Sequence, residues 1–285
     1  MPRSVTSVFS EPADFEAALR EEGGLGLLIT GRGQFRARLT QVKLHRLCLS
    51  ATEEQLSRIA FVAVPADMIL VSLARGRASA PIWGGVRLGT DEIMTLGAGQ
   101  CLHMRTDGPC RWGSIWLPAT ELVQYGRALT GANFAIPSAA QCWRLRPAMS
   151  RHLRHLHSAA IGLVERRSNA FIGGEAAHGL EQQLIGALVE CLSNGSAIEA
   201  TCATIAHQDI AVRFEALLHT HRERALRIAE IRTMLGVSTR ALCIGCKQQL
   251  GMGPAEYVRR CRMKQVDRAV RAAARESFMR MKFLC

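Results

Sequence analysis

The segment "LGVSTRALCIGCKQQLG", from Leu235 to Gly251, contains the signals of a tight turn followed by a helix. Gly236 can adopt the positive φ that a turn between two helices requires. Ser238 is a good N-cap for the helix that follows, and Gly251 is the residue type expected directly after its end. Because residues 228–235 also have a helical pattern, the segment predicts a helix-turn-helix.

The surrounding residues extend this helical region in both directions. Residues 209–222 place apolar side chains on one helical face, and residues 254–274 predict a long helix. The region is also strongly basic: from Asp209 onward the chain has 16 Lys and Arg against 7 Asp and Glu, a net charge of +9 out of a total of +12. A basic helical surface indicates a polyanion as partner, although a solvated Arg-rich surface explains the same composition.

Residues 228–269 resemble the DNA-binding domain of the AraC/XylS family of transcriptional regulators. The resemblance is carried by "LGVS" (235–238), Arg240, Leu242, "LGMGP" (250–254), Tyr257, Arg262 and the long helix that follows. It implies a bacterial, cytoplasmic regulator that binds double-stranded DNA through the second helix of the motif, which enters the major groove. It also implies a front half that senses a small-molecule effector or forms a homodimer.

The resemblance assigns DNA contacts to six residues on or beside this second helix: Ser238, Thr239, Arg240, Cys243, Ile244 and Lys247. Base edges are met at the positions of Arg240, Cys243 and Ile244, while the other three position the helix. Arg240 can make a bidentate contact with guanine, whereas a thiol is a weak donor and Ile244 offers only apolar contact. We therefore expect any sequence specificity to rest on Arg240.

Two further residues depart from the family pattern. Arg232 stands where the family has a small residue between the two helices, so its side chain must bend outward or push the second helix away. Gly245 lies within the second helix, where it costs roughly 1 kcal/mol relative to Ala. Both departures predict a weakened reading of DNA.

The end of the chain departs from the family more strongly. The family domain has two helix-turn-helix units joined by the long helix that residues 254–274 resemble. Residues 275–285, "RESFMRMKFLC", match no part of a second unit. We therefore expect a truncated DNA-binding domain whose binding is weak and mostly non-specific. The alternatives are a sensor and dimerisation module that acts only by pairing with intact relatives, and a non-functional remnant.

The sequence of the front half predicts β structure followed by helices. From Gly23 to Leu117, short apolar runs alternate with turn residues, which is typical of a sandwich or small barrel. Residues 148–193 carry two apolar stripes at helical spacing and predict a helical hairpin. This hairpin either packs on the β structure or pairs with a second copy in a homodimer.

These patterns predict an α+β protein of three parts. Residues 1–195 form an effector-sensing and dimerisation domain, with a cupin-like β barrel or sandwich and the helical hairpin. The cupin-like layout is again a resemblance to the family, supported by the stretch 97–118. Residues 196–208 form a small, polar linker, and residues 209–285 form the all-α helix-turn-helix domain without its second unit.

The sequence offers little support for enzymatic or metal chemistry. Cys243 and Cys246 lie within one predicted helix without a second pair, which favours a buried thiol over zinc ligation. His152, His155 and His157 are expected on the flank and polar side of a helix, with no carboxylate to complete a metal site. Because no phosphate-binding loop or nucleophile elbow occurs, we expect no catalytic residues, no enzymatic activity and no cofactor.

The tryptophans of the front half and the cysteines of the chain give information about a possible ligand pocket and about the cellular compartment. Trp83, Trp112 and Trp116 are either core residues or the lining of an effector pocket, and they do not identify an effector. The ten cysteines of the chain lack paired spacing and no secretory signal precedes them, so we expect reduced thiols in the cytosol. The most apolar stretch, 59–74, is too short and too interrupted to span a membrane.

Overall fold

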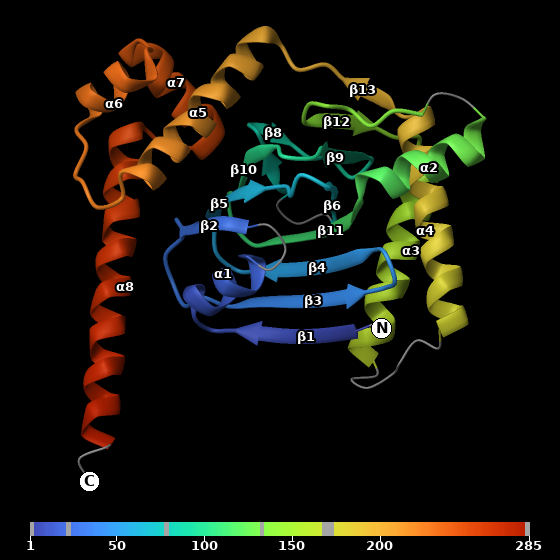
Figure 1. The fold of residues 1–285 in the computed structure, drawn as a ribbon, viewed down its shortest axis with the longest axis horizontal. Helices are drawn as coiled ribbons and strands as arrows, with labels where there is room; N and C mark the ends of the chain where they lie inside the picture. The colour runs from blue at the N-terminus through green and yellow to red at the C-terminus, as the bar shows by residue number, and fades with distance from the viewer. Residues whose placement is uncertain (1–2, 21–23, 77–79, 132–133, 167–173, 283–285) are drawn as a thin grey trace. The chain divides into compact units, whose positions relative to one another are not determined.

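The computed structural model describes residues 3–20, 24–76, 80–131, 134–166 and 174–282 (Figure 1). The chain divides into two compact units, Met1–Ile205 and Ala206–Cys285. The first unit combines two antiparallel sheets with helices, and the second unit is helical. The chain is therefore an α+β protein.

Two sheets form the body of the first unit. The larger has eight strands in the order β1 (Arg3–Phe9), β3 (Ala37–Lys43), β4 (Cys48–Glu54), β11 (Cys110–Pro118), β6 (Met68–Ala74), β9 (Glu92–Leu96), β12 (Gln141–Arg144) and β13 (Ser196–Ile198). The smaller has five strands in the order β2 (Gly24–Ile29), β5 (Arg58–Ala63), β10 (Cys101–Thr106), β7 (Ile82–Trp83) and β8 (Val86–Arg87). All of these strand pairs are antiparallel.

The two sheets pack face to face around an apolar core. Buried side chains from both sheets meet there, including Leu39 and Trp116 from the larger sheet and Val62 and Met104 from the smaller one. Within the described residues no strand pairing joins the two sheets, so the predicted cupin-like barrel is not closed. The alternative prediction of a sandwich describes this arrangement.

Three helices cover the other face of the eight-stranded sheet: α2 (Ala119–Thr130), α3 (Pro147–Arg166) and α4 (Gly174–Asn194). Residues of α3 and α4 such as Leu153, Ala160 and Leu188 are buried in one cluster with Val71 and Ile115 of the sheet. The two helices occupy the predicted hairpin, whose connection at 167–173 lies outside the described residues (Figure 1). The packing alternative for the apolar stripes is therefore the one observed in the chain.

The structure corrects the sequence analysis at both ends of the first unit. β1 and α1 (Pro12–Arg20) precede the region predicted to be β-rich, which began at Gly23. The predicted linker at 196–208 instead contains β13, which pairs with β12, and the start of α5 (Cys202–Thr220). The two strands, β1 and β13, share one physical cause for being missed, because a strand at the edge of a sheet is defined by a partner that is distant in sequence.

His157 is a further correction. It was expected on the flank or polar side of its helix, but its side chain is fully buried and its Nε2 lies 3.0 Å from the Ser50 carbonyl oxygen. The room for the ring comes from Gly113 in β11, where an added Cβ would lie only 2.6 Å from His157 Cε1. His152 and His155 are exposed, as expected.

The second unit contains α5 from Ala206 onward, α6 (Ile228–Leu235), α7 (Thr239–Leu250) and α8 (Pro254–Lys282). Its small core is built from apolar side chains of all four helices and the loop before α6: Ile210, Ala211, Phe214, Leu226, Ile231, Leu235, Leu242, Cys246, Leu250, Tyr257 and Val258. α6 and α7 have the limits predicted from the sequence.

Candidate nucleic-acid interface

The turn between α6 and α7 is fixed by the residues that predicted it. Gly236 ends α6 with φ of 67° and ψ of 32°, and the N–H of Val237 donates to the Arg232 carbonyl oxygen at 3.2 Å. Ser238 caps α7, because its hydroxyl oxygen accepts a hydrogen bond of 3.1 Å from the Ala241 N–H. Gly251 ends α7 with φ of 74°. Because these contacts join residues that are close in sequence, the local sequence is sufficient to determine the turn.

α7 has a buried face and an outward face. Leu242, Gly245, Cys246, Gln249 and Leu250 are buried in the second unit. The six residues predicted to contact DNA lie away from this face: Ser238, Thr239, Arg240 and Lys247 are exposed, and Cys243 and Ile244 are half-buried.

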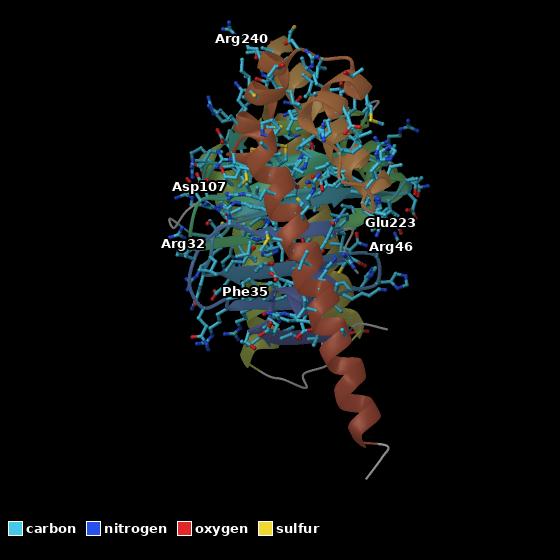
Figure 2. All side chains as sticks on the ribbon, turned by 90° about the vertical axis from the view of Figure 1, so that its left-hand side faces the viewer. Arg32, Phe35, Arg46, Asp107, Glu223 and Arg240 are labelled. Carbon is cyan, nitrogen blue, oxygen red and sulfur yellow. The ribbon has the colours of Figure 1, made fainter. Side chains whose placement is uncertain are left out.

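The outward face presents a simple chemical pattern. Positions 240, 243, 244 and 247 share one side of a helix because they are separated by three, four and seven residues. Arg240 and Lys247 therefore place a cation at each end, with the thiol of Cys243 and the apolar Ile244 between them. The Arg240 side chain extends away from the helices of this unit (Figure 2). Its guanidinium is thus available to a ligand outside the protein.

Arg232 and Gly245, the two departures from the family pattern, have different surroundings. Arg232 is exposed, so its side chain does not lie buried between α6 and α7. Gly245 faces α5, where an added Cβ would lie 3.4 Å from the His207 carbonyl oxygen and 3.4 Å from Ile210 Cγ2. The glycine therefore lies where α7 approaches α5 closely.

Two hydrogen bonds fasten the motif and the loop before it to the neighbouring helices, and a third joins those two helices to each other. Arg213 of α5 donates from its guanidinium to the Leu235 carbonyl oxygen at 2.6 Å, at the last residue of α6. Arg262 of α8 donates to the Leu226 carbonyl oxygen at 2.7 Å, just before α6. The hydroxyl of Tyr257 donates to Glu215 Oε2 at 2.6 Å and so joins α8 to α5. Burial and the nearby Glu215 carboxylate raise the pKa of Tyr257, which keeps this donor protonated.

The start of α6 is held by Glu230. Its carboxylate accepts hydrogen bonds from the Arg227 N–H at 2.7 Å and from the Arg224 guanidinium at 2.6 Å. The backbone hydrogen bond from Arg227 is the main reason that the pKa of Glu230 is lowered. A negative charge in the first turn also suits the helix dipole. Neither Glu230 nor Arg213 was predicted from the sequence, although Asp209 and Arg213 have the i,i+4 spacing of a helical ion pair.

Cys246, one of the two thiols of α7, lies in the core of the second unit. Burial raises the pKa of Cys246 to about 12, so its sulfur stays protonated and behaves as a core side chain. Within the described ranges, no group of three or more His, Cys, Asp or Glu is placed to hold a metal ion.

The first unit contains a small cavity between the two sheets. Trp83, Trp112 and Trp116 all line it, together with Arg58 and Met104. Its volume is about 30 Å³, which leaves room for about two water molecules. The Nε1–H groups of Trp83 and Trp112 donate to Ser72 Oγ at 3.1 Å and to Glu54 Oε1 at 2.7 Å. The Trp116 Nε1–H has no hydrogen-bond partner in the described part of the chain.

One wall of this cavity holds a buried ion pair that sequence analysis missed. Arg58 Nε donates to Glu54 Oε2 at 2.6 Å and Arg58 Nη2 donates to Glu54 Oε1 at 2.8 Å, a bidentate arrangement. Arg58 is 1 % exposed and Glu54 is 3 % exposed. Burial lowers the pKa of Arg58, but the Glu54 carboxylate more than offsets this effect, so the pKa is raised.

Comparisons with known proteins find only remote similarity. No protein-family model matches the chain, and no curated protein matches it. Among solved structures, the AraC-like transcriptional activator CuxR is similar with a TM-score of 0.49 and 18 % identity, over 93 % of this chain and 95 % of that one. Fatty-acid-bound ToxT from Vibrio cholerae gives a TM-score of 0.33 and 13 % identity, over 80 % and 82 %. A ToxT variant without ligand, from the same organism, gives 0.32 and 10 %, over 82 % of each chain. Scores and identities this low do not assign a function to this chain.

None of the helices in the described ranges is both long enough and apolar enough to cross a membrane.

Proposed function

We propose that this chain is a DNA-binding transcription regulator in which α7 enters the major groove of double-stranded DNA. The observation that carries the proposal is the outward face of α7, where exposed Arg240 and Lys247 lie on a helix whose turn and caps are fully formed. A helix-turn-helix with a basic outward helix is suited to this groove.

Each residue of this face has a distinct role in the proposal. Arg240 reads a guanine through two parallel N–H donors, and Ile244 contacts a thymine methyl group. Cys243 adds little because a thiol is a weak donor. Ser238 and Thr239 lie at the N-terminus of α7, whose free N–H groups and dipole favour a phosphate, and Lys247 contributes a phosphate contact from the last turn. Affinity therefore comes mainly from phosphates, and specificity comes mainly from Arg240.

Selection of bound duplexes from a random DNA pool tests these roles. The wild-type chain is expected to enrich one guanine, and Arg240→Ala is expected to lose that preference, since one bidentate contact is worth about 1–3 kcal/mol. Lys247→Ala is the matched comparison, because loss of a phosphate contact weakens binding to all sequences alike. An enriched motif that is identical for wild type and Arg240→Ala would rule out the proposed reading of DNA.

A sensory role for the first unit is a second proposal, carried by the inter-sheet cavity and its unpaired Trp116 Nε1–H. The volume of about 30 Å³ is too small for a metabolite, so a small-molecule effector must displace the surrounding side chains. Because three tryptophans line the cavity, effector binding is expected to change their fluorescence. A compound that alters DNA affinity without altering this fluorescence would place the effector site elsewhere.

The main alternative is a module that no longer binds DNA and acts only by pairing with related chains. It makes the opposite prediction for the selection experiment, in which no sequence would be enriched and no duplex would be retained at low salt.

A further inference from the structure

The outer edge of β1 is an unusual feature of the first unit. β1 is the outermost strand of the eight-stranded sheet and pairs with β3 on one side only (Figure 1). No other described strand pairs with its outer edge. Val5 is 48 % exposed and Val8 is 60 % exposed, and they are two of the few large apolar side chains that the described residues leave open to solvent.

The other strands at the sheet edges are protected. β8 has two residues and β13 has three, which is too short to accept a further strand. β2 packs against α1, which has a smaller contact with β1. β1 has seven residues that pair with β3 in one continuous register without a bulge. From Ser4 to Ser10 the chain contains no charged residue and no proline, which are the usual means of blocking an exposed edge.

We infer that the outer edge of β1 pairs with the same edge of a second copy of this chain. The two strands would run antiparallel across a two-fold axis and join two eight-stranded sheets into one. The free N–H and C=O groups along the edge supply the hydrogen bonds. This inference goes beyond the proposed function and does not depend on DNA binding.

The two-fold axis limits the register. Rotation about an axis perpendicular to the sheet keeps each side chain on the same face of the sheet. Because successive residues of a strand point to opposite faces and paired residues point to the same face, paired residues must both be odd-numbered or both be even-numbered. A register centred on Ser7 places Val5 opposite Phe9 of the second copy, and Thr6 opposite Val8. A register centred on Thr6 would instead place Val5 opposite Ser7 and Val8 opposite Ser4. Cross-strand pairs of β-branched and aromatic residues are the more stable, which favours the register centred on Ser7.

The chemistry of the edge suits a second copy better than another partner. The stretch from Ser4 to Ser10 is uncharged and meets its own copy without like-charge repulsion, and the Ser7 register covers both exposed valines with apolar or β-branched side chains. Because each chain offers one such edge, the pairing closes as a dimer and does not extend into a fibre. The hairpin of α3 and α4, for which dimerisation was one of the two roles considered from sequence, has no exposed large apolar side chain among its described residues.

Sedimentation velocity of the full chain without DNA tests the inference. The wild type is expected to show a dimer that dissociates on dilution. The dimer contains two Val5–Phe9 pairs, one on each side of the axis, and Val5→Lys removes both. We therefore expect the dissociation constant of the dimer to rise about tenfold. Leu129→Lys makes the same substitution at another exposed apolar residue, 61 % exposed and located on α2, and is expected to leave the dimer unchanged.

Circular dichroism confirms that each variant is folded before its assembly is compared. A wild type that stays monomeric at every concentration overturns the inference. So does a Val5→Lys chain that dimerises like the wild type, or a Leu129→Lys chain that dissociates as Val5→Lys should.

Cysteine cross-linking tests the register in the same chain. In a Cys202→Ser background, which removes an exposed native thiol, Ser7→Cys places two thiols opposite each other across the axis, within reach of a disulfide. Mild oxidation is expected to give a covalent dimer for Ser7→Cys and little for Thr6→Cys. A dimer from Thr6→Cys alone would overturn the register, and no covalent dimer from either variant would overturn the pairing.

Discussion

The two units of this protein treat their charged side chains in opposite ways. In the first unit, Glu54, Arg58, Glu16 and Glu181 are buried, each with a hydrogen-bond or ion-pair partner. In the second unit, none of the described Lys, Arg, Asp or Glu side chains is buried. Charged side chains therefore belong to the core of the first unit, whereas those described in the second unit all remain at its surface. Substitution of a buried charge in the first unit should accordingly cost stability, whereas substitution of Arg240 or Lys247, which have no described structural bond, should affect binding.

The largest effect is expected from Glu54→Gln. This change leaves Arg58 as a buried charge without its partner, which costs roughly 3–5 kcal/mol of folding stability. Glu53→Gln is the matched control, because Glu53 is the neighbouring residue and its ion pair with Arg111, at 3.3 Å, is largely exposed. An exposed pair contributes about 1 kcal/mol or less. Denaturant unfolding of both variants measures the difference, and equal losses would contradict the contrast between buried and exposed charge.

A smaller effect is expected from acid, through His157. Burial, followed by the charge of Arg75, lowers the pKa of His157 from 6.5 to about 4. The unfolded chain therefore binds a proton more readily than the folded chain between these two values. The stability due to neutral His157 is complete above pH 6.5 and is lost as the pH falls toward 4, by about 3 kcal/mol in total.

The unfolding free energy of wild type and His157→Gln across this pH range measures that contribution. The difference between the two chains should shrink as the pH falls. A difference that stays constant from about pH 7 to about pH 4 would show that His157 does not titrate as its buried position requires.

The smallest effect is expected from Gly245→Ala in α7. Alanine favours a helix by up to about 1 kcal/mol over glycine. Its Cβ would sit at ordinary contact distance, 3.4 Å from the nearest atoms of α5. We expect a rise in thermal midpoint with unchanged DNA affinity, because the outward face of α7 is not altered. A fall in stability would show that α5 and α7 cannot move apart enough to accommodate the added methyl group.

The helix-turn-helix could be predicted from sequence because local residues set its limits. Gly236, Ser238 and Gly251 each act on a backbone group within a few residues of their own position, so the predicted ends of α6 and α7 agree with the structure. The tethers from Arg213 and Arg262 escaped notice, since they reach carbonyl groups 22 and 36 residues away. The DNA contacts of the six residues on and beside α7 stay a prediction.

Several features of the first unit could not be predicted, because they depend on contacts between strands and sheets that no local sequence pattern shows. β1 is a strand because Arg3 to Phe9 align with Lys43 to Ala37, and its own residues alternate too weakly to predict it. The burial of His157 requires Gly113, a glycine on a distant strand. Glu54 and Arg58 are only four residues apart, but their burial as a pair depends on the stacking of the two sheets to which their strands belong. Each of these features depends on how the strands and sheets are arranged in space. The sequence predicts the class of fold but not this arrangement.

The most direct test of the central claim is fluorescence anisotropy of the chain with DNA from upstream of its own gene and with a scrambled duplex, titrated at low and near-physiological salt. We expect binding to both duplexes at low salt, a steep loss of affinity with added salt, and a modest preference for the upstream DNA that Arg240→Ala abolishes. Failure to bind either duplex at low salt, or a preference that Arg240→Ala leaves intact, would contradict the assignment of α7 as a DNA-reading helix.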